Sequence, residues 1–148
     1  MSQKEICRFE AKSMFDMPPF YTLVYFADRR CDFTSPAAEA INNALDIRSK
    51  VLRMRLLCGC SINSSHALFL GGVFNLFVKE CGDSIAKLSD IESAVFDLKT
   101  YFDFVDPTNS ILLFPIGGEY DGIPASEIKA VFERVFEGVD VTVVFCNV

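Results

Sequence analysis

The chain has 148 residues, of which 51% are hydrophobic and 15 are Phe, so it is long and apolar enough to form one domain with a large core. Its formal net charge of −6 disfavours duplex nucleic acid as a partner, because a negative field repels phosphates. No apolar run is long enough to span a membrane and no secretory signal is present, which predicts a cytoplasmic protein without a membrane partner. We expect residues 1–148 to form a single domain.

The cysteines do not form a pattern typical of a disulfide framework or a metal site. Without a secretory signal, free and buried thiols are favoured. Cys58-Gly59-Cys60, with His66 and Cys81 downstream, lacks the two usable ligand pairs of a structural zinc site. We therefore expect no metal and no cofactor. The six cysteines are Cys7, Cys31, Cys58, Cys60, Cys81 and Cys146.

The first predicted elements are an extended segment, a strand and a helix. Residues 1–18 indicate an extended lead-in that ends at prolines. Residues 20–27 are rich in aromatic and β-branched side chains, which predicts a strand. Ser35 followed by Pro36 is typical of a helix N-terminus, where Ser caps and Pro takes the first helical position. The mostly apolar stripe of this helix consists of Ala38, Ile41, Leu45 and Arg48.

The sequence from residue 51 to residue 82 predicts a strand and then a helix. From Val51 to Cys60, arginines alternate with apolar residues, and a period of two is typical of a strand. Gly71-Gly72 precedes Val73, where apolar residues begin to recur at helical spacing, and Gly82 is a typical helix end.

A further helix is predicted after residue 88. Ser89 and Glu92 form a capping-box pair, and apolar residues follow at helical spacing up to Asp106-Pro107. We expect the carboxylates of this segment to lie on a solvated helix face or at its cap: Asp97, Asp103 and Asp106.

The last third of the chain predicts a strand, a loop, a helix and a strand. Residues 111–116 form a continuous apolar run, which favours a strand covered on both faces. Pro124 precedes a helix whose apolar stripe includes Phe132, and residues 139–147 alternate as a final strand. A strand–helix–strand unit with short links indicates a parallel crossover, and hence an α/β domain.

A glycine-rich loop, Gly117 to Gly122, lies between that strand and that helix. Ligands of open α/β sheets bind at this edge, where glycines let backbone N–H groups approach phosphates. A plain tight turn is the alternative interpretation. The loop matches neither the P-loop nor the dinucleotide fingerprint. With Gly71-Gly72 as a second, weaker copy, two loops could clamp a diphosphate.

Nucleophilic catalysis has little support, because His66 is the only histidine and thus the only His base. Glu119 and Asp121 share the glycine-rich loop, but residues two apart in an irregular turn have no defined mutual geometry.

Three segments resemble the macro domain (X domain) family of ADP-ribose-binding α/β/α modules. Gly71-Gly72-Val73, eight residues and Gly82 are similar to the family's glycine run and helix. Residues 114–124 resemble its strand end and Ser-Thr-Gly-Ile-Phe-Gly-x-Pro loop, and residues 31–34 are similar to its Gly-Asp-Ile-Thr after the first strand. The compact layout resembles that of viral, nidovirus-type nonstructural members.

The resemblance implies a three-layer α/β/α sandwich with a mostly parallel sheet. It implies that Asp32 contacts the adenine amine and that Asn63 lies near the distal ribose. It also implies that Gly71, Gly72 and Val73 line one side of the diphosphate. The loop is implied to line the other side through Gly117, Gly118, Tyr120 and Gly122.

Two functions follow from this resemblance. The first is binding of ADP-ribose or a related nucleotide diphosphate, with or without weak ADP-ribose-phosphate phosphatase or ADP-ribosyl hydrolase activity. The second is a protein- or single-stranded-RNA-interaction module that has lost ADP-ribose. Glu119 and Asp121 favour the second, because a carboxylate repels a diphosphate by about 1–4 kcal/mol at ~4 Å.

Overall fold

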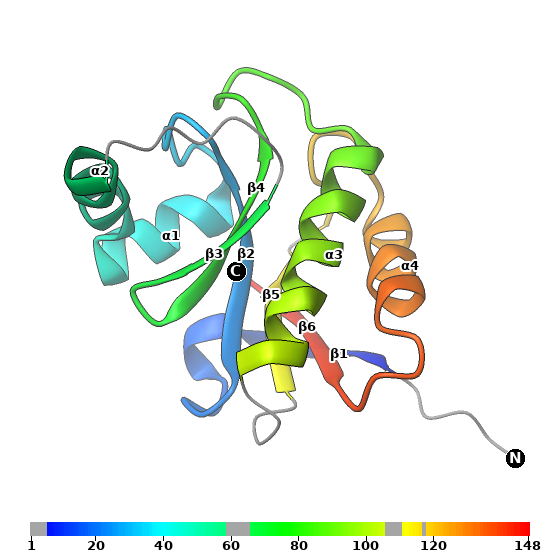
Figure 1. The fold of residues 1–148 in the computed structure, drawn as a ribbon. Helices are drawn as coiled ribbons and strands as arrows, with labels where there is room; N and C mark the ends of the chain where they lie inside the picture. The colour runs from blue at the N-terminus through cyan, green and yellow to red at the C-terminus, as the bar shows by residue number, and fades with distance from the viewer. Residues whose placement is uncertain (1–5, 59–65, 106–110, 117) are drawn as a thin grey trace, which may run out of the picture.

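The structure, a computed structural model, describes residues 6–58, 66–105, 111–116 and 118–148 (Figure 1). The strands are β1 (Cys7–Ser13), β2 (Thr22–Asp28), β3 (His66–Leu70), β4 (Val73–Lys79), β5 (Ile111–Pro115) and β6 (Thr142–Asn147). The helices are α1 (Pro36–Leu45), α2 (Ile47–Cys58), α3 (Leu88–Val105) and α4 (Ala125–Val135), with a 3-10 helix at Met14–Asp16. Within the described ranges, no helix combines the length and apolar character needed to cross a bilayer.

The strands form one sheet in the order β1-β6-β5-β2-β4-β3. Neighbouring strands are parallel except for β3 and β4, which pair antiparallel. Helices α1 and α2 cover one face, and α3 and α4 cover the other (Figure 1). The predicted three-layer α/β/α sandwich with a mostly parallel sheet is therefore confirmed.

The two faces of the sheet carry separate hydrophobic cores because side chains alternate along each strand. In β2, Val24 and Phe26 pack toward α3 and α4, whereas Tyr25 and Ala27 pack toward α1 and α2. Strand β5, between β2 and β6, is buried over most of its length, as the continuous apolar run predicts. The parallel β5–α4–β6 unit is also confirmed.

The N-terminal segment contributes more than an extended lead-in. Residues Cys7–Ser13 form the edge strand β1, parallel to β6, and the Cys7 side chain lies in the core. Cys7 is its one buried residue, and the charged side chains of Arg8, Glu10 and Lys12 suit an edge strand, but the short segment carries no turn signal that separates it from a lead-in.

The predicted strand from Val51 to Cys60 is wrong, because residues 47–58 form helix α2. Among residues 47–57, whose side chains the structure describes, only Ile47 and Val51, one helical turn apart, are fully buried. Arg, Leu, Met and Lys are strong helix formers. The alternation of arginines with apolar residues is therefore compatible with a helix that buries one narrow stripe.

The predicted helix from Val73 is also wrong, because residues 73–79 form strand β4, buried at every position. A short apolar run fits a buried strand and a buried helix equally well by spacing. Gly71 and Gly72, with φ of 70° and 81°, form the two-residue turn of the β3–β4 hairpin, for which two positive φ values are typical.

Two expectations for the third helix are also corrected. Helix α3 begins at Leu88, so Ser89 lies inside its first turn rather than at the cap. Asp97 is half-buried, and its carboxylate accepts a hydrogen bond from the Ala67 N–H at 2.7 Å, so it ties α3 to β3 in addition to meeting solvent. The side chains of Asp103 and Asp106 lie outside the described residues.

Candidate functional site

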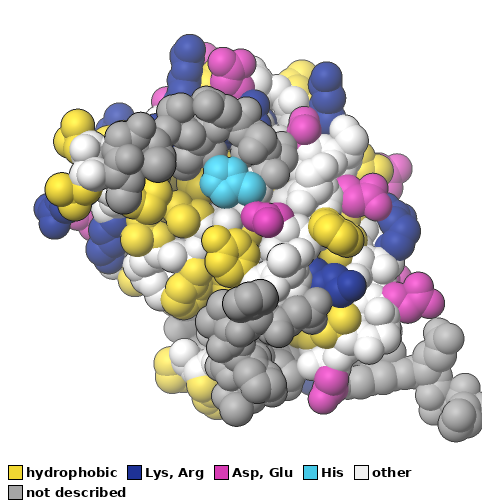
Figure 2. Space-filling view, viewed as in Figure 1, with side chains coloured by type: hydrophobic (Ala, Val, Ile, Leu, Met, Phe, Trp, Pro, Cys, Tyr) yellow, Lys and Arg dark blue, Asp and Glu magenta, His cyan; other side chains and the backbone are white. Residues whose placement is uncertain are grey.

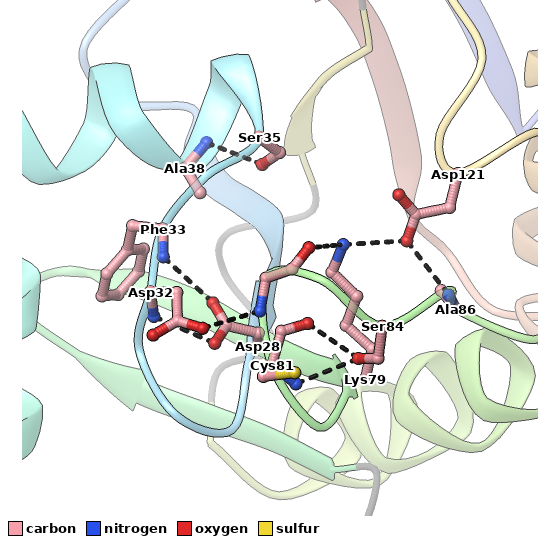
Figure 3. Close-up of polar contacts among 11 residues, drawn as sticks. Asp28, Asp32, Phe33, Ser35, Ala38, Lys79, Cys81, Ser84, Ala86 and Asp121 are labelled. Carbon is pink, nitrogen blue, oxygen red and sulfur yellow. Dashed lines mark hydrogen bonds and ion pairs between the residues drawn. The ribbon is translucent and has the colours of Figure 1, made fainter.

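The carboxyl ends of β2, β4 and β5 meet at one edge of the sheet because these neighbouring strands run parallel. Three loops leave this edge: residues 29–35, residues 80–87 and the loop that leads into α4 (Figure 3). Ligands of open α/β sheets bind at such an edge. The residues of these three loops therefore define the candidate site.

Asp28, the last residue of β2, organises the first loop. It is buried, and its two carboxylate oxygens accept hydrogen bonds from the N–H groups of Asp32 and Phe33, at 2.9 and 3.0 Å (Figure 3). Cys31 and Phe33 have positive φ values of 59° and 51°, so the chain turns sharply here. These two bonds hold that turn and direct the chain toward Ser35.

The second loop is joined to the first by Asp32, whose carboxylate accepts a hydrogen bond from the Gly82 N–H at 2.8 Å. A Cβ atom on Gly82 would lie 2.6 Å from Thr34 Oγ1. The absence of a side chain at Gly82 is therefore what allows the two loops to approach.

The third loop is joined to the second by a buried lysine. Lys79, at the end of β4, places Nζ 2.9 Å from Asp121 Oδ2 (Figure 3). The same carboxylate oxygen accepts a hydrogen bond from the Ala86 N–H at 3.0 Å. Asp121 thus points toward the protein, and its charge is balanced by Lys79.

Tyr120 lies under this ion pair. Lys79 Nζ is 5.2 Å from the centre of the Tyr120 ring, and the ring packs edge-on against Phe26 at 4.9 Å. Burial, followed by the charges of Asp121 and Asp28, raises the pKa of the Tyr120 phenol, which stays protonated at neutral pH. This tyrosine can donate a hydrogen bond but does not serve as a base.

The glycine-rich loop contains a tight turn. Tyr120 and Ile123 exchange backbone hydrogen bonds of 3.0 and 2.9 Å, and the residues between them, Asp121 and Gly122, have φ of 50° and 81°. Two positive φ values are typical of a type I′ turn, for which Asp-Gly is a preferred sequence. This turn geometry by itself accounts for the glycine at position 122, so no bound ligand is needed to explain it.

A cleft of about 250 Å³ lies between the first and third loops. The N-terminus of α1 forms one side through Ser35, Pro36 and Ala37. Most of the other lining is apolar, and Glu119 adds a carboxylate. These other lining residues are Phe26, Phe114, Pro115, Ile116, Glu119, Tyr120 and Val148.

Comparison with known proteins identifies the fold. No family model and no curated protein sequence matches the chain. The macrodomain of Thermus aquaticus DarG is 14% identical, with a TM-score of 0.72 over 96% of this chain and 97% of that one. The Mycobacterium tuberculosis DarG macrodomain is 12% identical, with a TM-score of 0.73 over 98% and 99%. The IBV X-domain is 12% identical, with a TM-score of 0.57 over 98% and 92%.

The chain has a macrodomain fold. The fold prediction from three short segments is therefore confirmed, although the segment that begins at Gly71 is a hairpin turn and a strand and not a loop and a helix. Asp32 follows the strand at residues 22–28, as expected, but its carboxylate accepts a hydrogen bond from the Gly82 N–H. It is absent from the residues that line the cleft.

The structure does not bring Gly71, Gly72 and Val73 to the candidate site. Their hairpin lies at the amino end of β4, about 20 Å along this seven-residue strand from its carboxyl end. A Cβ atom on Gly71 would come within 2.6 Å of Ile47 Cδ1, so Gly71 allows close packing of α2. The expectation of two glycine loops that clamp a diphosphate is therefore wrong.

The remaining predicted site residues lie in different parts of the molecule. Tyr120 lines the cleft, and Gly122 belongs to the adjacent turn. Gly118 lines a second cavity of about 360 Å³, on the α4 side of Ile116. Asn63 and Gly117 lie outside the described residues.

Sequence reasoning missed the α1 N-terminus as part of the macrodomain cleft. The Ser35-Pro36 signal predicted a helix start, and the Ser35 hydroxyl accepts the Ala38 N–H at 3.3 Å as expected of a cap. Because N–H groups at a helix start attract anions, this signal could also have indicated a ligand-facing position. Pro36 removes one of those N–H donors.

The described cysteines and carboxylates form no group of three that could hold a metal ion. Cys7, Cys31, Cys81 and Cys146 are in no disulfide, and all but Cys81 are buried. The side chains of Cys58 and Cys60 lie outside the described residues. His66 begins β3, packs at a tilt against Phe77, and is not part of the cleft lining.

Proposed function

We propose that the chain is a binding module for ADP-ribose or a related nucleotide diphosphate, with the ligand in the cleft between α1 and Tyr120. The supporting observation is the position of this cleft, at the carboxyl edge of the sheet of a macrodomain fold. The resemblance to the macro domain family adds the chemical class of the ligand.

The lining of the cleft suits the base and sugar better than the phosphates. Its walls are formed by aromatic and proline side chains, and Tyr120 supplies a hydrogen-bond donor. A volume of about 250 Å³ lies just below the range of ~300–1,000 Å³ of ordinary small-molecule pockets. We therefore place the nucleoside part inside and the diphosphate toward the rim, near the N-terminus of α1.

Binding without turnover is the activity that the cleft supports best. Among the described residues that line it, Glu119 is the one acidic side chain, and the Tyr120 phenol is held protonated. The Ser35 hydroxyl is engaged as a helix cap. We expect release of ADP-ribose from a modified protein, and of phosphate from ADP-ribose phosphate, to remain at the rate of a buffer control.

The test is a calorimetric and thermal-shift titration with ADP-ribose, AMP and ribose 5-phosphate. We expect ADP-ribose and AMP to raise the melting temperature by about 2–5 °C at 1 mM, and ribose 5-phosphate to have little effect. Ala37→Glu should abolish the shift by placing a carboxylate in the cleft. Ala44→Glu is the matched control, since Ala44 is exposed on the same side of α1, about 10 Å farther along. No shift with the wild-type chain, or equal shifts in both variants, overturns the proposal.

A second function, an interaction module that does not bind ADP-ribose, is favoured by Glu119 in the cleft and by the missing N–H of Pro36. It predicts no thermal shift with ADP-ribose. Filter binding of single-stranded RNA then separates an RNA partner from a protein partner.

A further inference from the structure

Helix α2 packs against the domain through one narrow side. Ile47 and Val51 are fully buried, and the residues between and after them are mostly exposed. In Figure 1, α2 stands at the margin of the molecule, beyond α1 and away from the middle of the sheet. Most of its surface is therefore available to a partner.

The exposed surface of α2 combines leucine with positive charge. Leu52, Leu56 and Leu57 are 38%, 86% and 80% exposed. The helix contains four of the 14 Lys and Arg residues of the chain and none of the 20 Asp and Glu residues. Figure 2 shows hydrophobic and basic side chains side by side at this end of the molecule. A basic segment of this kind contrasts with the net charge of −6 of the chain.

Leucine and arginine side chains are interleaved around the exposed side of α2. At about 100° per residue, Leu52 and Leu56 are neighbours on one side. Arg53 lies between Leu56 and Leu57, and Arg48 borders Leu52 on the other side. Apolar and cationic groups thus alternate around the exposed arc instead of separating into two faces.

We propose that α2 is the docking surface for an acidic amphipathic helix of a partner protein. Such a helix can cover the leucines with its apolar side chains and place carboxylates against Arg48 and Arg53, so one partner satisfies both kinds of group. The complementarity of charge selects this partner, because α2 has no acidic residue that would repel it.

A nucleic acid or a lipid bilayer would make favourable contacts with only one of the two kinds of side chain on α2. A nucleic acid would pair its phosphates with the arginines but leave the leucines in water. A lipid bilayer would cover the leucines, but Arg53 lies between two of them and would have to approach the hydrocarbon region with its charge. A protein helix avoids both costs.

The test uses the full chain and a synthetic helical peptide with Leu on one face and Glu at the flanking positions. A peptide of the same composition in scrambled order is the control. We expect the helical peptide to bind at micromolar to millimolar concentration, more weakly as salt increases, and the scrambled peptide not to bind. No binding at about 1 mM, or equal binding of both peptides, overturns the proposal.

Two variants locate the contact. Leu56→Ser together with Leu57→Ser should weaken binding by about tenfold or more, while Phe96→Ser, which removes a side chain that is 60% exposed on α3, should not. Arg53→Glu should weaken binding of the acidic peptide, and a peptide with Lys at the facing position should restore it.

Other occupants give distinct results. A concentration-dependent dimer that is lost in the leucine variant would assign the surface to a second copy. Stronger binding of single-stranded RNA or anionic vesicles than of the peptide would assign it to those partners. Each of these results, the dimer included, overturns the proposal. The α2 variants should leave the ADP-ribose titration unchanged, so this proposal and the proposed cleft ligand fail independently.

Discussion

Lys79 Nζ lies 2.9 Å from Asp121 Oδ2, and this ion pair joins the end of β4 to the turn that precedes α4. Both side chains are largely shielded, with 6% and 22% of their surfaces exposed. The sequence predicts that Asp121 places negative charge beside a ligand, but its carboxylate is directed into the protein. The pair holds the turn that positions Tyr120 in the cleft.

The Lys79–Asp121 pair should contribute unequally when either partner is removed. Asp121→Asn leaves the more deeply buried ammonium without its anion, so we expect a loss of about 2–4 kcal/mol in the free energy of unfolding. Lys79→Met leaves a carboxylate that keeps the Ala86 N–H and partial access to water, so the loss should be about 1–2 kcal/mol. Asn tolerates the positive φ of position 121, so backbone strain does not confuse the comparison.

Denaturant unfolding of both single variants and the double variant measures the coupling between the two residues. Lys99→Met, at a half-buried position on α3 beside the exposed Phe96 ring, is the control for loss of a lysine. A coupling free energy indistinguishable from zero would contradict a stabilising role for this pair.

Gly82→Ala should destabilise the site by steric conflict with a known neighbour. The new Cβ would lie 2.6 Å from Oγ1 and 2.9 Å from Cγ2 of Thr34, and crowding of this kind costs about 1–3 kcal/mol. Thr34→Ala removes both atoms, so the double variant should recover most of the stability measured by thermal unfolding. If Thr34→Ala gives no recovery, the loss has another cause.

Glu119→Gln should strengthen binding of ADP-ribose in the proposed cleft. The change removes a carboxylate that lines the cleft while keeping the size of the side chain. Because Glu119 is exposed, solvent screens its charge, and we expect only about a two- to fivefold lower dissociation constant by calorimetry. AMP, with a single phosphate, should gain less. Glu137→Gln, at an exposed position after α4, is the control, and equal effects of both variants would exclude a role for Glu119.

The free energy of unfolding should fall in alkaline solution, because the domain buries thiol and phenol groups in their protonated form. Burial, and to a smaller extent the charge of Glu10, raises the pKa of the Cys146 thiol from 9.0 to about 11. Between these values the unfolded thiol has lost its proton and the folded thiol keeps it. The unfolded state then binds fewer protons, so stability decreases as pH rises, by about 2–3 kcal/mol for this group.

Cys146→Ala should reduce the slope of the unfolding free energy between pH 9 and 11 without abolishing it. The rest of the slope comes from Cys31, Tyr25 and Tyr120, whose pKa values are also raised, chiefly by burial. Cys81→Ala, at a half-buried position, is the control for the loss of a thiol elsewhere in the domain. Identical slopes in wild type and Cys146→Ala would contradict this assignment.

The last third of the chain was predictable because its signals are local. A continuous apolar run, Asp121-Gly122 in a tight turn, and a proline before an amphipathic helix each restrict the backbone directly. The N-terminus of α1 was predictable for the same reason, since the capping bond of Ser35 lies within a single turn.

Between residues 47 and 79 the same reasoning failed, because the apolar spacing there is compatible with two structures. Val73 to Lys79 is buried as a strand because β2 and β3 pair with it on both sides. Helix α2 buries Ile47 and Val51 in the core beside α1, and these two are the fully buried residues among its described side chains. Those contacts are between segments distant in sequence, so no local pattern contains them.

By itself, the sequence predicted an α/β fold and the strand, turn, helix and strand of its last third, because hydrophobic periodicity and turn chemistry act over a few residues, and the resemblance of three segments added the macro type. The tertiary structure alone decided the composition of the candidate site. Gly71-Gly72 lies at the amino end of β4, away from the cleft. Asp32 bonds to Gly82 and Asp121 pairs with Lys79, and the N-terminus of α1 lines the cleft. These placements depend on which strands become neighbours, and that choice minimises exposed apolar surface over the whole chain.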